Sequence, residues 1–195
     1  MARSRTIWVT AALMTATLGA AVVPATAAPA AAPRAAAAAC PTGWGSLPKT
    51  DYTGTLNSVT NARTGRHDCY DRFVVDVPGA AAADIGYFVQ YVDRFVADPS
   101  GITIPVTGGA ILEVRVNAPA YNPETGASTY PGRFARPLPG VNVTGYSTFR
   151  DTKYGGSFEG QTQFGLGVRA RLPFRVLPLD GRLVVDVAHS WTATR

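Results

Sequence analysis

The sequence predicts an all-β protein folded as a single-domain β-sandwich of two sheets. Apolar and polar residues alternate with a period of two in several short runs, which is the pattern of strands with one buried face. Turn-forming pairs such as Pro78-Gly79 and Asp180-Gly181 stand between these runs. The segment Arg-x-Val-Val-Asp-Val occurs at residues 72–77 and again at residues 182–187, which indicates quasi-repeated strands.

An export signal is predicted at the N-terminus. Arg3 and Arg5 precede an apolar run that is followed by a small-x-small cleavage site at residues 25–27. The run is short and soon broken by proline, which disfavours the alternative of a retained membrane anchor. Residues 1–27 are therefore predicted to be a cleaved signal peptide. The processed protein is expected to be secreted or associated with the cell envelope, without a transmembrane span.

The next segment differs sharply in composition from the rest of the chain. Residues 28–39 consist of alanine, spaced proline and one arginine, and they predict a flexible tether. The following part, about residues 40–193, has the size of one domain. The net charge of +5 falls to +3 when Arg3 and Arg5 leave with the signal peptide. Because this charge is mild and no basic run or aromatic-interleaved basic patch occurs, no nucleic acid partner is expected.

The chain has two cysteines, Cys40 and Cys69. An even number of cysteines in an exported chain predicts a disulfide. The bridge would close a loop of roughly 30 residues and stabilise the fold by about 3–4 kcal/mol. Lipid anchoring at Cys40 is the alternative. It is disfavoured because alanines precede Cys40 where a lipidation site has a larger aliphatic residue, and because the tether separates Cys40 from the apolar run.

Each predicted strand has an apolar side and a polar side. In residues 71–77, Phe73, Val75 and Val77 are predicted to enter the core, while the even-numbered side chains face water. Val185 is expected to occupy the corresponding core position in the second copy of the repeat. The same alternation is found in residues 84–92, 110–116, 164–179 and 182–187.

Two hairpins and one helix candidate are predicted. Residues 102–116 contain two β-branched runs joined near Thr107-Gly108-Gly109, which is typical of a hairpin. Asp180-Gly181 joins residues 174–179 to residues 182–187 in the same manner. The alanine-rich residues 80–84 are the helix candidate.

Residues 117–140 form the longest stretch without periodicity. A loop of this length in a compact domain is usually functional or disordered. Its rings and guanidinium groups would suit contact with a carbohydrate or wall polymer, and Tyr130 and Arg133 are the candidates for that role. The favoured alternative is that the aromatic residues pin the loop onto the sandwich. The full set considered comprises Tyr121, Tyr130, Arg133, Phe134 and Arg136.

No catalytic residue, metal site or cofactor is predicted. His67 and His189 are the two histidines of the chain, and neither has metal-ligand spacing with other donors. The chain also lacks a Gly-x-Ser-x-Gly elbow, a Ser-x-x-Lys motif, a phosphate loop and a dinucleotide fingerprint. A carboxylate pair could still serve a secreted hydrolase of glycosidase type. The pairs considered are Asp76 with Asp186 and Asp151 with Glu159.

Four segments carry a resemblance to a known family: DRFVVDV (71–77), GSFEGQTQFGLGV (156–168), PFRVLPLDGRLVVDV (173–187) and AHSW (188–191). Together they resemble the AMIN-like domain family of exported bacterial proteins over about residues 60–191. This family is distantly similar to the AMIN domains that localise periplasmic amidases and secretin-type transporters. The resemblance implies a two-sheet sandwich and a non-catalytic module that binds peptidoglycan or other envelope partners. It also implies that the repeated strands lie near the two ends of the domain, one in each half.

Four further candidates for ligand binding are arginines, because planar guanidinium groups pair with carboxylates. Arg72 and Arg182 lie on the wet face of the repeated strands. Arg–Asp ion pairs within or across these strands are the expected arrangement there. Arg169 and Arg171 are predicted to alternate outward along a strand within residues 156–171 and to meet wall carboxylates.

The expected function is thus that of a non-catalytic, exported cell-envelope module. Peptidoglycan or another wall component is the expected ligand. Two alternatives stay open at this point: a secreted hydrolase that uses a carboxylate pair, and an envelope protein that binds a protein partner.

Overall fold

The computed structural model describes residue 40 and residues 43–191 of the 195-residue chain. The predicted signal peptide (1–27) and tether (28–39) lie outside the described residues, as do residues 192 and 193 of the predicted domain. The described part is all-β, as predicted, and its strands form two main antiparallel sheets and one small sheet. Residues 80–84 contain one short 3-10 helix, η1 (Ala82–Asp84), where the sequence indicated a helix.

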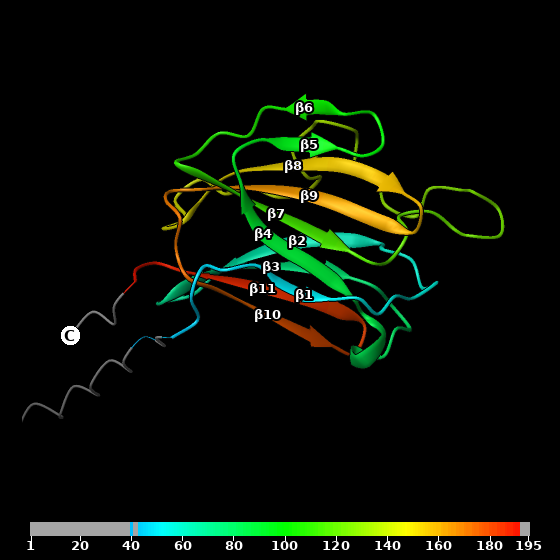
Figure 1. Ribbon diagram of the computed structural model, residues 1–195, viewed down its shortest axis with the longest axis horizontal. Coiled ribbons are helices and arrows are strands. Elements are labelled where there is room, and N and C mark those ends of the chain that lie inside the picture. Colours follow the sequence, from blue (N-terminus) through cyan, green and yellow to red (C-terminus); the bar gives the residue numbers. More distant parts are fainter. Residues whose placement is uncertain (1–39, 41–42, 192–195) are drawn as a thin grey trace, which may run out of the picture. The chain divides into compact units, whose positions relative to one another are not determined.

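Both main sheets are antiparallel throughout, and Figure 1 shows them stacked as two layers. The five-stranded sheet has the order β1 (Lys49–Asp51), β4 (Tyr87–Val92), β7 (Ala110–Val116), β9 (Gln161–Val168) and β8 (Phe149–Phe158). The four-stranded sheet has the order β10 (Phe174–Leu179), β11 (Arg182–Ala188), β3 (Tyr70–Asp76) and β2 (Asn61–Arg66).

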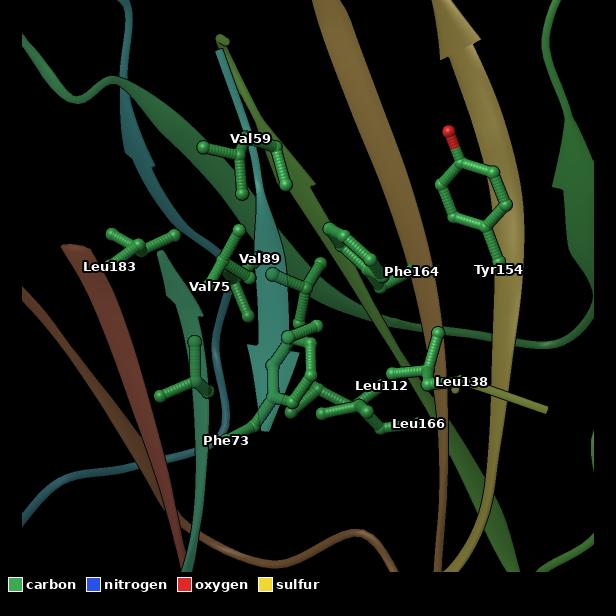
Figure 2. Packing of buried hydrophobic residues seen from close by; sticks show 14 of the residues in the cluster. Val59, Phe73, Val75, Val89, Leu112, Leu138, Tyr154, Phe164, Leu166 and Leu183 are labelled. Atoms are coloured by element: carbon green, nitrogen blue, oxygen red, sulfur yellow. The ribbon is translucent and has the colours of Figure 1, made fainter. Parts of the chain in front are cut away.

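The core lies between the two sheets. Phe73 and Val75 of β3 are fully buried, as the alternation predicts, and Val185 of β11 joins them. Figure 2 shows such side chains facing those of the opposite sheet, including Phe164 of β9. The rings of Phe73 and Phe164 meet edge to face, with centroids 5.4 Å apart. Each fully buried large apolar side chain stabilises the fold by about 1.5–3 kcal/mol, so this layer holds the sheets together.

The predicted hairpin over residues 102–116 is wrong. Its first half is β6 (Ile102–Ile104), which pairs with β5 (Phe95–Ala97) in a separate two-stranded sheet. Its second half is β7, which pairs with β4 and β9. A period of two predicts strands but does not say which strand each one pairs with. The hairpin across Asp180-Gly181 is confirmed, because Leu179 of β10 pairs with Arg182 of β11.

The two copies of Arg-x-Val-Val-Asp-Val are antiparallel neighbours in one sheet, β3 and β11. They do not lie in separate halves of the domain. Their register places Arg72 opposite Asp186 and Arg182 opposite Asp76. The repeat therefore has a structural reason: in this antiparallel register, two copies of the same segment put each arginine opposite the other copy's aspartate.

Candidate functional site

The outer face of the four-stranded sheet gathers charged side chains from all four strands. Arg72 and Asp76 lie on β3, and Arg182 and Asp186 on β11, as the repeat predicts. The neighbouring strands add two arginines. We call this surface the arginine face, and it comprises Arg63, Arg72, Asp76, Arg175, Arg182 and Asp186. The arginine face holds four guanidinium groups and two carboxylates, so its net charge is positive.

Asp186 is shared by two guanidinium groups. Its side chain has 0% exposure, and its carboxylate accepts hydrogen bonds from Arg72 Nε at 2.6 Å and Nη2 at 2.9 Å. Arg175 Nε approaches the same carboxylate at 2.8 Å from the other side. The hydrogen bond to Asp186 also raises the pKa of Arg72. One buried carboxylate thus orients two partly exposed cations, one of which it cannot neutralise.

Aromatic rings contact the guanidinium groups of Arg72 and Arg175. The guanidinium carbon of Arg175 lies 4.5 Å from the ring centroid of Trp44, and that of Arg72 lies 5.3 Å from the ring of Tyr70. Trp44 and Tyr70 contact each other, with centroids 5.7 Å apart. Neither Nη atom of Arg175 donates to another residue of the described chain. The Nη atoms of Arg175 are therefore held in place without a protein acceptor, and they can donate hydrogen bonds to an anionic ligand.

The predicted disulfide between Cys40 and Cys69 is present, and it fastens the segment that carries Trp44. Cys69 immediately precedes β3. Gly45 O also accepts a hydrogen bond from Phe174 N at the start of β10. Trp44 is held at the arginine face by these links at both of its sides.

Asp76 organises the other end of the arginine face. Arg63 binds it in bidentate fashion, with Nε to Oδ2 and Nη2 to Oδ1 both at 3.0 Å. Arg182 stands opposite Asp76 in the register and is exposed. Partial burial by itself would raise the pKa of Asp76. The hydrogen bonds and charge of Arg63, with help from Asn61 and Arg182, hold that pKa below its usual value.

An apolar row separates the two charged rows. Val74 and Val184, on the face predicted to be wet, are only 3% and 2% exposed. Leu177 of β10 continues this row opposite Val184. The charged residues of one strand are four positions apart, so the two charged rows are separated by roughly 13 Å. The arginine face therefore offers cationic positions on both sides of an apolar strip, and Arg63 of β2, opposite Val74 in the register, ends that strip at the edge of the sheet.

Arg169 and Arg171 do not lie on a strand, which corrects the sequence prediction. β9 ends at Val168, and both arginines lie in the connection to β10. Arg169 donates to the carbonyl oxygens of Ser147 and His189. Arg171 donates to Ser46, and its guanidinium lies 5.2 Å from the ring of Tyr91. Both side chains fasten loops at this end of the sandwich.

Tyr130 and Arg133 also lie outside the arginine face, and they differ from each other in burial. Tyr130 is only 2% exposed, and its ring packs 5.0 Å from Tyr154 and 5.8 Å from Phe164. Burial raises the pKa of its hydroxyl. Tyr130 thus pins the 117–140 loop onto the core, and it cannot touch a surface ligand. Arg133 is exposed on that loop.

The structure brings neither proposed carboxylate pair together. Asp76 and Asp186 are offset by four positions along neighbouring strands, roughly 13 Å, which exceeds the spacing of glycosidase carboxylates. Asp151 binds Thr107 N and Lys153 Nζ, and Glu159 lies eight residues further along the chain, past the end of β8.

Within residues 40 and 43–191, no group of three or more His, Cys, Asp or Glu is placed to hold a metal ion. No helix of that part is long and apolar enough to cross a membrane.

Sequence reasoning missed Trp44, Arg63 and Arg175. Arg175 follows the same two-residue alternation in the strand that precedes the second repeat, which is a signal that was available. Trp44 and Arg63 carry no such signal, because the disulfide and the strand order bring them to the arginine face.

A family model of the AMIN-like domain matches residues 57–189. The chain belongs to the AMIN-like domain family. The matched range of this AMIN-like protein contains every residue of the arginine face, whereas Trp44 and Cys40 precede it. No curated protein and no solved structure gives a significant match.

Proposed function

We propose that this AMIN-like protein is an exported, non-catalytic cell-envelope module that binds an anionic wall polymer, such as peptidoglycan, through the arginine face. The observation that carries this proposal is that Arg72 and Arg175 share one buried carboxylate, Asp186, and so keep a net positive charge at fixed positions. Carboxylates on the peptide stems of peptidoglycan would pair with the free guanidinium donors.

Several features support export and a binding role. A disulfide is typical of proteins outside the cytoplasm, and the Cys40–Cys69 bridge accords with the predicted signal peptide. Family membership points to an envelope module. The charged groups of the arginine face are spread over all four strands of the sheet, which suits an extended polymer better than a small substrate.

Co-sedimentation of the mature protein with purified insoluble peptidoglycan tests the proposal. The wild-type protein is expected to pellet at low ionic strength and to be released by salt, because exposed ion pairs are screened. The Arg63→Gln/Arg182→Gln variant should bind at least about tenfold more weakly, since it loses two cations of the arginine face. Both side chains are exposed, so the fold should be retained.

The matched control is Arg66→Gln/Arg94→Gln, which removes the same net charge from exposed positions outside the arginine face. It should pellet like the wild type. Wall binding is the wrong function if the wild-type protein stays in the supernatant at every salt concentration. The assignment to the arginine face is wrong if both double variants lose binding equally.

A further inference from the structure

The outer face of the five-stranded sheet is hollowed beside the β8–β9 turn. Three adjoining depressions there have volumes of about 300, 350 and 320 Å³. Gln161 lines all three, and Glu159 and Tyr52 each line two of them. The three depressions adjoin one another through these shared residues, and together we call them the Gln161 groove. Its lining includes Tyr52, Phe88, Asp98, Phe158, Glu159 and Gln161.

The position of the Gln161 groove restricts how a ligand can be recognised. It lies on the face of the sheet, and β9 is already paired on both sides, with β7 and β8. The strand beneath the groove therefore has no free edge to which a peptide could add as an extra strand. A ligand in the Gln161 groove therefore does not bind by strand addition to β9, and we expect the side chains that line the groove to recognise it.

The lining of the Gln161 groove includes two exposed rings and two exposed polar side chains. Tyr52 is 88% exposed and Phe158 is 42% exposed. The side chains of Gln161 and Glu159 make no hydrogen bond or ion pair with another described residue. Aromatic rings pack against the apolar faces of sugar rings, and a carboxamide with a carboxylate supplies the donors and acceptors that sugar hydroxyls require.

The floor of the groove is rigid. Gln163 is only 3% exposed, and its Oε1 accepts a hydrogen bond from Asp98 N at 2.9 Å. Arg115 joins Asp98 to the buried Glu113, with Nη1 to Asp98 Oδ2 at 2.5 Å and Nε to Glu113 Oε1 at 2.9 Å. This network holds Asp98 at the rim before any ligand arrives, which reduces the cost of ordering the site on binding.

The charge of the groove selects against anionic polymers. Asp51, Asp98 and Glu159 line it with Arg115 as their one cationic neighbour in the lining. Glu159 also has φ 48°, in a turn where glycine or asparagine is favoured, so a carboxylate stands at this rim despite the conformational cost. We infer that the Gln161 groove is a second binding site, which takes an uncharged polysaccharide chain.

Isothermal titration calorimetry of the mature protein with the uncharged β-1,4-linked hexamers of N-acetylglucosamine and of glucose tests this inference. At least one hexamer should bind saturably, with little dependence on salt, because no ligand charge is involved. The Tyr52→Ala/Phe158→Ala variant should bind at least about tenfold more weakly. Both rings are exposed, so their removal should leave the fold intact.

The Glu159→Gly variant distinguishes a loss of hexamer binding from a loss of folding stability. It removes the carboxylate while relieving the positive φ, so it should weaken hexamer binding without lowering thermal stability. Leu179→Ala removes an apolar side chain of similar exposure (47%) from β10 of the other sheet and should bind like the wild type. The inference is overturned if neither hexamer binds, or if the Tyr52→Ala/Phe158→Ala variant binds as well as the Leu179→Ala control. Binding of oligolysine in place of both hexamers would also overturn it, in favour of a basic peptide partner.

Discussion

At the scale of single residues, the aspartates of the repeated strands act as fixed anions that orient arginines. Asp186 achieves this by full burial between two guanidinium groups. Asp76 is more exposed and depends on the bidentate Arg63. The two aspartates have the same sequence neighbours and yet different surroundings, because the strands that flank them differ.

The lowered pKa of Asp76 predicts a pH dependence of stability. A carboxyl group with a lowered pKa in the folded state stabilises the protein fully above its unfolded pKa, near 3.8, and this contribution is lost as the pH falls through the folded value. Arg63→Gln removes much of the cause. The difference in free energy of unfolding between wild type and Arg63→Gln should therefore be constant above about pH 5 and shrink below about pH 4.

Urea unfolding of both proteins over this pH range measures the difference. Arg94→Gln serves as the control for loss of one positive charge, and its difference from wild type should show no such step. If the difference in free energy of unfolding between wild type and Arg63→Gln stays constant below pH 4, the role assigned to the Arg63–Asp76 pair is contradicted.

At the scale of elements, the β5–β6 hairpin lies against the outer face of the five-stranded sheet, as Figure 1 shows. Phe95 of β5 is fully buried, and a Cβ added at Gly165 of β9 would come within 2.7 Å of its ring. The glycine thus makes room for the hairpin. Asp98 directly follows β5, so the seating of the hairpin also sets one rim of the Gln161 groove.

Gly165→Ala is expected to lower the free energy of unfolding by about 1–3 kcal/mol, because the added methyl group overpacks the contact with Phe95. Chemical denaturation measures this change. Gly65→Ala in β2 is the matched control, since its Cβ would meet its nearest neighbouring atom, Nε2 of His67, at an ordinary 3.7 Å. Equal effects of the two substitutions would mean that the hairpin is not seated on Gly165.

At the scale of the whole molecule, the two sheets turn surfaces of opposite character outward. The four-stranded sheet presents the arginine face, with a surplus of cations. The five-stranded sheet presents the Gln161 groove, lined by carboxylates and rings. The core lies between them, so no residue is shared by the two surfaces.

This separation predicts that the two binding functions are independent. Substitutions at sites more than about 10 Å apart without shared partners usually act additively. Arg63→Gln/Arg182→Gln should therefore leave hexamer affinity unchanged, and Tyr52→Ala/Phe158→Ala should leave peptidoglycan pelleting unchanged. Repeating both assays on both variants checks this, and loss of both activities in either variant would point to one shared site.

The all-β class, the core-facing residues of the repeated strands, the disulfide and the family could be predicted from the sequence alone. These depend on local alternation, on the number of cysteines and on segments such as DRFVVDV, all of which can be read along the chain. The export signal and the tether remain sequence predictions, because they lie outside the described residues.

The pairing of the strands and the contacts between their side chains could not be predicted from the sequence and required the three-dimensional fold. Residues 102–104 pair with β5 rather than with β7, the two repeats lie side by side, and Tyr130 is buried in the core. Arg72 meets Asp186 across a separation of 114 residues, and Trp44 reaches Arg175 from outside the family match. The physical reason is that alternation determines the face on which a side chain lies, whereas its partners depend on packing between strands that are distant in the sequence.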